Sequence, residues 1–165
     1  MSAAERGDGP SSPALPAPLE TLLRELETLD RTGRLEQLLA WADEFVEVPA
    51  EVAMRPYPER NHVPHCESEV HGFAVDRPDG TLDFHFAVGN RHGVSARAWA
   101  TVLVRGCSGQ PLEQVAVLPE ELIARVFGPA LSMGKDQGLS GMLELVRHAA
   151  RARLAARRTA PVTRA

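Results

Sequence analysis

The spacing of apolar residues first follows a helical period. Between residues 19 and 46, leucines recur every three or four positions, which predicts two helices packed as a hairpin. The first would bury Leu19, Leu22, Leu23, Leu26 and Leu29, and Gly33 would end it. The second would bury Leu35, Leu38, Leu39, Ala42, Phe45 and Val46 on one face. Prolines at 49, 56, 58 and 64 then predict an extended connector.

After the connector, apolar and polar residues alternate strictly along the chain. Residues 81–88 place apolar side chains at every second position, which predicts a strand with one buried face. Residues 69–76 form its expected partner. The turn between them reads RPDG, where proline fixes φ and glycine supplies a positive φ. The pattern therefore predicts an antiparallel hairpin.

Helical spacing returns after a polar loop at residues 89–93. A helix from Val94 would bury Val94, Ala98, Trp99, Val102 and Leu103, with Arg97, Thr101 and Arg105 on its other side, and would end at 108–111. A short helix would run from Pro119 to Gly128, and a long one from about Lys135 past Leu154. This order predicts an α+β fold, a small antiparallel sheet with helices packed on one face.

The composition of the chain predicts its domain organisation. Residues 1–18 are rich in Ser, Ala, Gly and Pro and are expected to be disordered, residues 19–155 to form a single domain, and residues 156–165 to form a flexible basic tail. A formal charge of −4 gives no argument for nucleic-acid binding. The sequence has neither a signal-peptide core nor an apolar run long enough to cross a bilayer, so we expect no membrane association and a cytoplasmic location.

Cys66 is the first candidate for chemistry. It lies in residues 60–70, RNHVPHCESEV, where His65 is adjacent and a proline-bearing loop could display the thiol before a strand begins. Nearby cationic groups favour the reactive thiolate. The alternative is a small buried core cysteine. Cys107, at a predicted helix end, is interpreted as an ordinary structural residue.

The histidines around Cys66 also raise a metal-binding or redox-sensing hypothesis. His62, His65, Cys66 and His71 are possible zinc ligands, but no CxxC pair or helical HxxxH pair is present. The sequence also has no G-x-S-x-G element and no phosphate-binding glycine loop. The spacing therefore disfavours a metal site, and the metal-binding or redox-sensing hypothesis remains the alternative.

Two ordered motifs resemble the SufE family of sulfur-acceptor proteins. Residues 61–70, NHVPHCESEV, resemble the family's N-x-V-x-G-C-Q-S-x-V-W segment, and residues 138–142, GLSGM, resemble its closing S-R-x-Q-G-L-x-x-M helix. Residues 100–111 resemble its central helix and polar turn. The similarity extends from about Leu19 to Leu154 and implies a SufE-like fold.

The resemblance implies a sulfur relay through Cys66. Cys66 would take persulfide sulfur from a pyridoxal-phosphate-dependent cysteine desulfurase and pass it to a downstream acceptor or an iron–sulfur scaffold. The protein would then be a non-enzymatic carrier and an activator of the desulfurase, with no metal or organic cofactor of its own. The resemblance also implies that Cys66 lies on an exposed or shallowly covered loop, near residues 89–93 and the start of the last helix.

The chain departs from the family's pattern at several positions. His65 replaces the glycine before the cysteine, Glu67 the glutamine after it, and His71 the tryptophan that closes the motif. Lys135 stands for the arginine leading the last helix, and His92 is nearest to an expected acidic residue. We expect His65 and His92 to stabilise a thiolate or persulfide anion at Cys66.

Overall fold

The computed structural model describes residues 13–89, 93–129 and 133–161. Within them the chain has an α+β fold with six α-helices, one short 3-10 helix and two strands, which confirms the predicted fold class. The elements are α1 (Ala17–Glu27), α2 (Arg31–Asp43), η1 (Glu59–Asn61), β1 (Val70–Asp76), β2 (Leu82–Val88), α3 (Val94–Cys107), α4 (Leu112–Val115), α5 (Glu121–Phe127) and α6 (Met133–Thr159).

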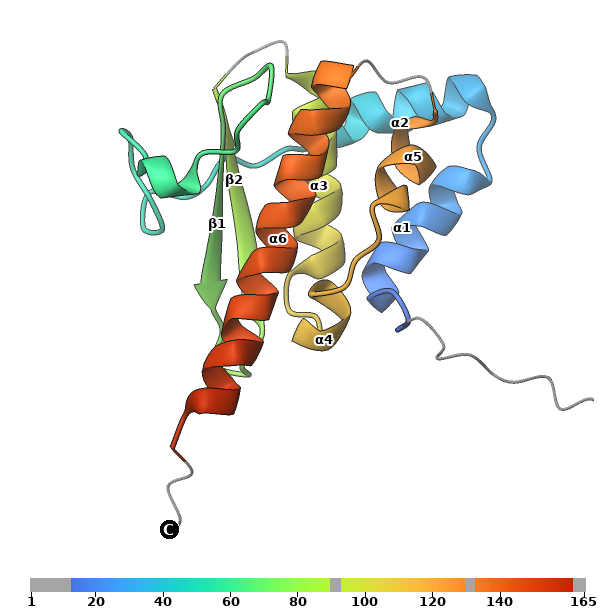
Figure 1. The fold of residues 1–165 in the computed structure, drawn as a ribbon. Coiled ribbons are helices and arrows are strands. Elements are labelled where there is room, and N and C mark those ends of the chain that lie inside the picture. Colours follow the sequence, from blue (N-terminus) through green and yellow to red (C-terminus); the bar gives the residue numbers. More distant parts are fainter. Residues whose placement is uncertain (1–12, 90–92, 130–132, 162–165) are drawn as a thin grey trace, which may run out of the picture.

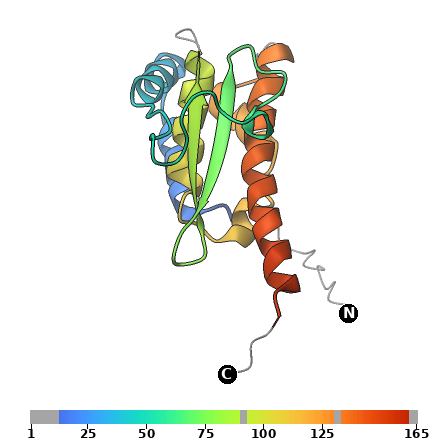
Figure 2. The ribbon, with the colours of Figure 1, turned by 90° about the vertical axis from the view of Figure 1, so that its left-hand side faces the viewer.

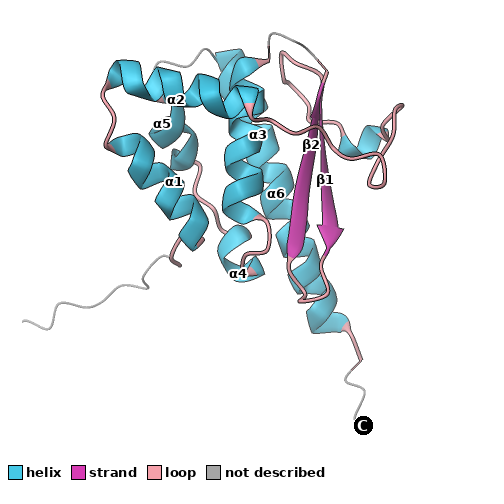
Figure 3. Ribbon diagram, turned by 180° about the vertical axis from the view of Figure 1, so that it is seen from behind, coloured by secondary structure: helices cyan, strands magenta, loops and turns pink. Residues whose placement is uncertain are grey.

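The two strands form the predicted antiparallel hairpin. Val70 pairs with Val88 and Asp76 with Leu82, and Gly80 has a φ of 84° in the connecting turn. Helices α3 and α6 pack on one face of the hairpin (Figure 1, and from behind in Figure 3). The connector after α2 crosses the other face (Figure 2), where Val48 packs with Phe73 and Ala87. Both faces of this small sheet are therefore covered.

Helix α3 is the centre of the main core. It contacts α1, α2, α6 and β2, and Trp99 on it is fully buried. The indole Nε1 of Trp99 donates to the main-chain oxygen of Leu139 on α6 at 3.0 Å. This bond satisfies the buried indole and ties α6 to the centre of the fold.

The predicted break between the first two helices was misplaced. Gly33 lies inside α2, and the helix boundary is at Asp30, whose Oδ1 accepts the Gly33 amide at 2.8 Å. An aspartate at this position satisfies an amide that the helix leaves unpaired, so it favours the start of α2 at residue 31. Helix α4, which the sequence pattern did not reveal, lies between α3 and α5.

The predicted buried face of α2 is wrong in part. Trp41 and Ala42 are buried, but Leu35 is 58% exposed, Leu39 45% and Val46 80%. Val94 is also exposed, whereas Thr101 is buried and its hydroxyl donates to the Trp41 main-chain oxygen at 2.9 Å. Helix α2 therefore covers the side of α3 that was expected to face solvent.

The chain ends differ from their expected boundaries. Helix α1 begins at Ala17 and α6 continues to Thr159, so helix includes residues expected in both flexible segments. Arg157 donates to the main-chain oxygen of Gly80, which connects the end of α6 to the hairpin turn. No described helix is long and apolar enough to cross a bilayer.

Replacing Trp99 with phenylalanine tests the link between α3 and α6. Trp99→Phe removes the indole donor to Leu139 and leaves a small gap, so we expect it to lower the free energy of unfolding by about 1–3 kcal/mol. Urea denaturation measures this change. The exposed Val117→Ala variant is the control and should change stability by less than about 0.5 kcal/mol. Equal stability of the two variants would contradict the assigned role of Trp99.

Candidate functional site

The segment before Cys66 is fixed to the edge of β1. The Val63 amide donates to the Val70 main-chain oxygen at 2.8 Å, and the Asn61 side-chain amide donates to the Gly72 main-chain oxygen at 2.8 Å. His62 and His71 form an isolated antiparallel bridge in the same region. After the loop, the Gly89 amide donates to the Glu69 main-chain oxygen at 2.8 Å. Both ends of the Cys66 loop are therefore held by the hairpin.

Two glycines on α6 allow the loop to lie directly against that helix. A Cβ atom at Gly138 would lie 2.9 Å from both the Cα and the Sγ of Cys66, and one at Gly141 would lie 2.8 Å from Val63 Cγ1. Residues three apart share a helix face, so the two glycines form one flat contact surface for residues 63–66. Any larger residue at Gly138 would displace the cysteine.

Cys66 is half-buried beside a small cavity of about 50 Å³. The cavity is lined by the loop, by the first turn of α3 and by the first turns of α6: Cys66, Glu67, Ser68, Gly93, Val94, Ser95, Ala96, Lys135 and Leu139. Cys66 therefore lies near Gly93 and the start of α6, as predicted. Residues 90–92 lie outside the described residues.

The surroundings of Cys66 keep its thiol protonated. Burial raises the pKa of Cys66 above its ordinary value of 9.0, the Ser68 main-chain amide lowers it, and the Glu67 carboxylate raises it. A raised pKa favours the protonated thiol over the thiolate at neutral pH. Among the described residues no histidine is a cause of this shift. The site thus favours the protonated thiol of Cys66, which is less reactive than the thiolate.

His65 has an unusual backbone conformation next to Cys66. Its φ is 61°, in the left-handed region that disfavours side chains, and its own side chain is exposed. The position where the family has glycine thus requires a glycine-like conformation, and the histidine adopts it at a cost of about 1–2 kcal/mol. His92 lies outside the described residues, so the roles expected of His65 and His92 at the thiol stay predictions.

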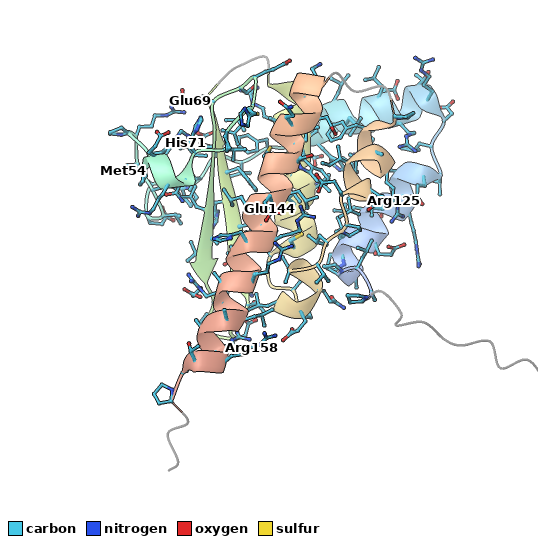
Figure 4. The ribbon with its side chains drawn as sticks, viewed as in Figure 1. Met54, Glu69, His71, Arg125, Glu144 and Arg158 are labelled. Atoms are coloured by element: carbon cyan, nitrogen blue, oxygen red, sulfur yellow. The ribbon has the colours of Figure 1, made fainter. Side chains whose placement is uncertain are left out.

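The other histidines of the motif lie along the edge of β1. Figure 4 shows His71 and Glu69 at the end of the hairpin from which the Cys66 loop leaves. The His71 ring is buried between Tyr57 and His62, with centroid distances of 5.1 and 5.3 Å. Burial, followed by the neighbouring His62, lowers the pKa of His71. In the part of the chain that the structure describes, no three His, Cys, Asp or Glu residues are grouped to hold a metal ion.

Cys107 occupies a different environment from Cys66. It is fully buried in the main core, and burial raises its pKa to about 12. It is a free thiol, as is Cys66. These properties are those of a small apolar core residue, which agrees with the interpretation from sequence.

Sequence reasoning missed part of the site. It did not assign a role to Gly138, to Ser68 or to the first turn of α3. The pattern G-x-x-G at 138–141 was visible and indicated a close helix contact, but only the fold shows that the contacting residue is Cys66.

The fold and the loop define a small α+β protein that holds one cysteine against its last helix. The chain belongs to the SufE family, described as an Fe-S metabolism associated domain, whose profile matches residues 20–150. This confirms the resemblance seen in the motifs. Uncharacterized SufE-like proteins from two strains of Mycobacterium tuberculosis are each 29% identical over 139 residues, which is 81% of this chain and 92% of the relative. The solution structure of a hypothetical protein from Thermus thermophilus is similar in fold, with a TM-score of 0.68 and 22% identity, over 86% of this chain and 99% of that one.

An alanine at Gly138 should push Cys66 off α6. Alanine favours a helix by up to about 1 kcal/mol over glycine, so a loss of stability would come from the steric conflict with Cys66. We expect Gly138→Ala to raise the rate of Cys66 alkylation by iodoacetamide several-fold. Gln137→Ala, on an exposed neighbour in the same helix, should leave the rate unchanged. An unchanged rate in Gly138→Ala would contradict the assigned contact.

The acidic neighbour of Cys66 should influence its titration. Glu67→Gln removes a charge that raises the pKa of Cys66, so this pKa should fall while burial, the larger cause, keeps it raised. Below the pKa, the alkylation rate should rise about tenfold per pH unit, with the variant curve shifted to lower pH. The control is Glu69→Gln, an exposed residue that is not among the causes of the shift. Identical curves for both variants and the wild type would refute this effect.

Proposed function

We propose that this protein is a sulfur carrier that accepts persulfide sulfur on Cys66 from a cysteine desulfurase. It would pass the sulfur to a downstream acceptor or scaffold for iron–sulfur cluster assembly or related sulfur metabolism. The observation that carries this proposal is the position of Cys66, which is half-buried on a loop that lies beside the first turns of α3 and α6. The chain also belongs to a family associated with Fe-S metabolism.

The transfer is an exchange between two cysteines. The Cys66 thiolate attacks the outer sulfur of the donor persulfide, a new S–S bond forms on Cys66, and the donor's own S–S bond breaks. The donor cysteine leaves as a thiolate. Overall a thiol and a persulfide exchange one sulfur atom, so neither an oxidant nor a cofactor on this chain is required.

The cavity beside Cys66 supports a role after the transfer. Its volume of about 50 Å³ exceeds the roughly 10–15 Å³ that a cavity needs to hold one water molecule, so it has space for the added sulfur atom. A persulfide that lies there would be partly covered by Ser95, Ala96 and Leu139. In this proposal His65 and His92 stabilise the persulfide anion.

The protonated resting thiol implies that the donor must expose Cys66. The Sγ atom packs against Gly138, and burial is the largest cause of its raised pKa. Moving the loop off α6 would remove that burial, raise the thiolate fraction and open a path for attack. Contact with the donor would thereby couple docking to reactivity, and free Cys66 would react slowly with other thiols.

Intact mass spectrometry tests the carrier function. The full chain is incubated with a cysteine desulfurase, pyridoxal phosphate and cysteine, and its mass is measured before and after reduction. We expect the wild type to gain one or more sulfur atoms that a reductant removes, and Cys66→Ser to gain none. Cys107→Ser is the matched control and should gain sulfur as the wild type does, because Cys107 is buried. The same gain in Cys66→Ser would overturn the proposal.

A further inference from the structure

Helix α2 has exposed leucines that the rest of the described chain does not cover. Trp41 and Ala42, in its last turn, are buried, while Leu35 and Leu39, nearer its N-terminal end, are exposed. Leucines four residues apart lie on the same face of a helix, so these two form a short apolar stripe. Exposed apolar patches of this kind mark interaction sites in soluble proteins.

Leu35 of this stripe lines a groove between α2 and α5. The groove has a volume of about 890 Å³, and its apolar lining includes Leu35, Leu38, Val126 and Phe127. Leu38 and Phe127 are partly buried and pack against the main core, so the floor of the groove is fixed by the fold. A rigid apolar floor can accept apolar side chains without first being ordered.

The rim of the groove is positively charged, although the chain as a whole carries −4. Arg31, Arg34 and Arg125 line it together with one acidic residue, Glu27. Arg125 pairs with Glu27 at 2.8 Å and with Glu20 at 4.0 Å. The positive charge of the rim therefore comes mainly from Arg31 and Arg34. The Arg34 guanidinium donates to the Arg125 main-chain oxygen at 2.6 Å, a contact that fixes the side chain without cancelling its charge. The complementary ligand is a segment that carries both apolar and acidic side chains.

The α2 side of the groove lies at the same end of the molecule as the Cys66 loop. Gly128 and Pro129, which line the groove, are close in the chain to α6, whose first turns line the Cys66 cavity. Figure 1 shows α2 and the start of α6 at this end, and Figure 4 shows Arg125 further down, level with Glu144. One partner can therefore reach both places.

We propose that this groove anchors an acidic, apolar segment of the protein that delivers sulfur to Cys66. The inference rests on the proposed carrier function and adds a second contact, distant from the thiol, that holds the donor while the Cys66 loop moves. Residues 1–12 of the chain itself are a poor ligand for the groove, because Met1 is their one large apolar side chain. Two joined contacts also bind more tightly than either alone.

A binding titration tests the groove. The full chain, labelled at its N-terminus, is titrated with a cysteine desulfurase, and fluorescence anisotropy gives the Kd. Leu35→Glu and Arg31→Glu each change an exposed groove residue and should raise the Kd about tenfold or more. The matched controls are Val117→Glu, which changes another exposed apolar residue, and Arg158→Glu, at the far end of α6. The Kd of both controls should stay within about twofold of the wild-type value. Circular dichroism and melting temperature verify that all four variants fold.

The outcomes separate this inference from the carrier function, because sulfur gain is measured independently by mass. Groove-dependent binding without sulfur gain would uphold the groove and refute the carrier. Sulfur gain with equal Kd values for groove and control variants would uphold the carrier and refute the groove. Neither binding nor transfer would refute both. A wild-type dimer that Leu35→Glu dissociates in sedimentation would show that a second copy fills the groove and would overturn a donor segment as its ligand.

Discussion

The close contact between the Cys66 loop and α6 is the constraint on which the site depends. It requires glycine at 138 and 141, because side chains there would occupy the space of Cys66 and Val63. It also requires α6 to be fixed, which the Trp99 bond to Leu139 achieves from the core. The same helix turn that bonds to Trp99 lines the cavity beside the thiol. The geometry of the site therefore depends on the packing of α6 against the core.

This contact contributes to the raised pKa of the Cys66 thiol, because it buries the thiol against α6. Burial against α6 and the Glu67 charge both raise the Cys66 pKa, while the strained His65 backbone lies next to the cysteine in an exposed loop. The departures from the family's motif at His65 and Glu67 thus affect the backbone conformation and the charge beside Cys66.

The exposed leucines of α2 leave apolar surface that the rest of the described chain does not cover. Trp41 and Ala42 in the last turn of this helix are buried, whereas Leu35 and Leu39 nearer its N-terminal end are exposed. Arginines line the groove beside Leu35, although the whole chain carries a charge of −4. Charge at a rim directs partner choice, while apolar area at the floor supplies affinity.

The sequence by itself determined the α+β class, the hairpin turn at 77–80 and the identity of the cysteine loop, because local period, turn chemistry and motif order are encoded by neighbouring residues. It placed the α1–α2 boundary at Gly33 instead of Asp30, because capping competes with the glycine signal. Only the tertiary structure decided that Gly138 contacts Cys66, that the Cys66 pKa is raised, and that Leu35 is exposed. Each of these depends on which distant element packs against the residue, and periodicity within one element carries no such information.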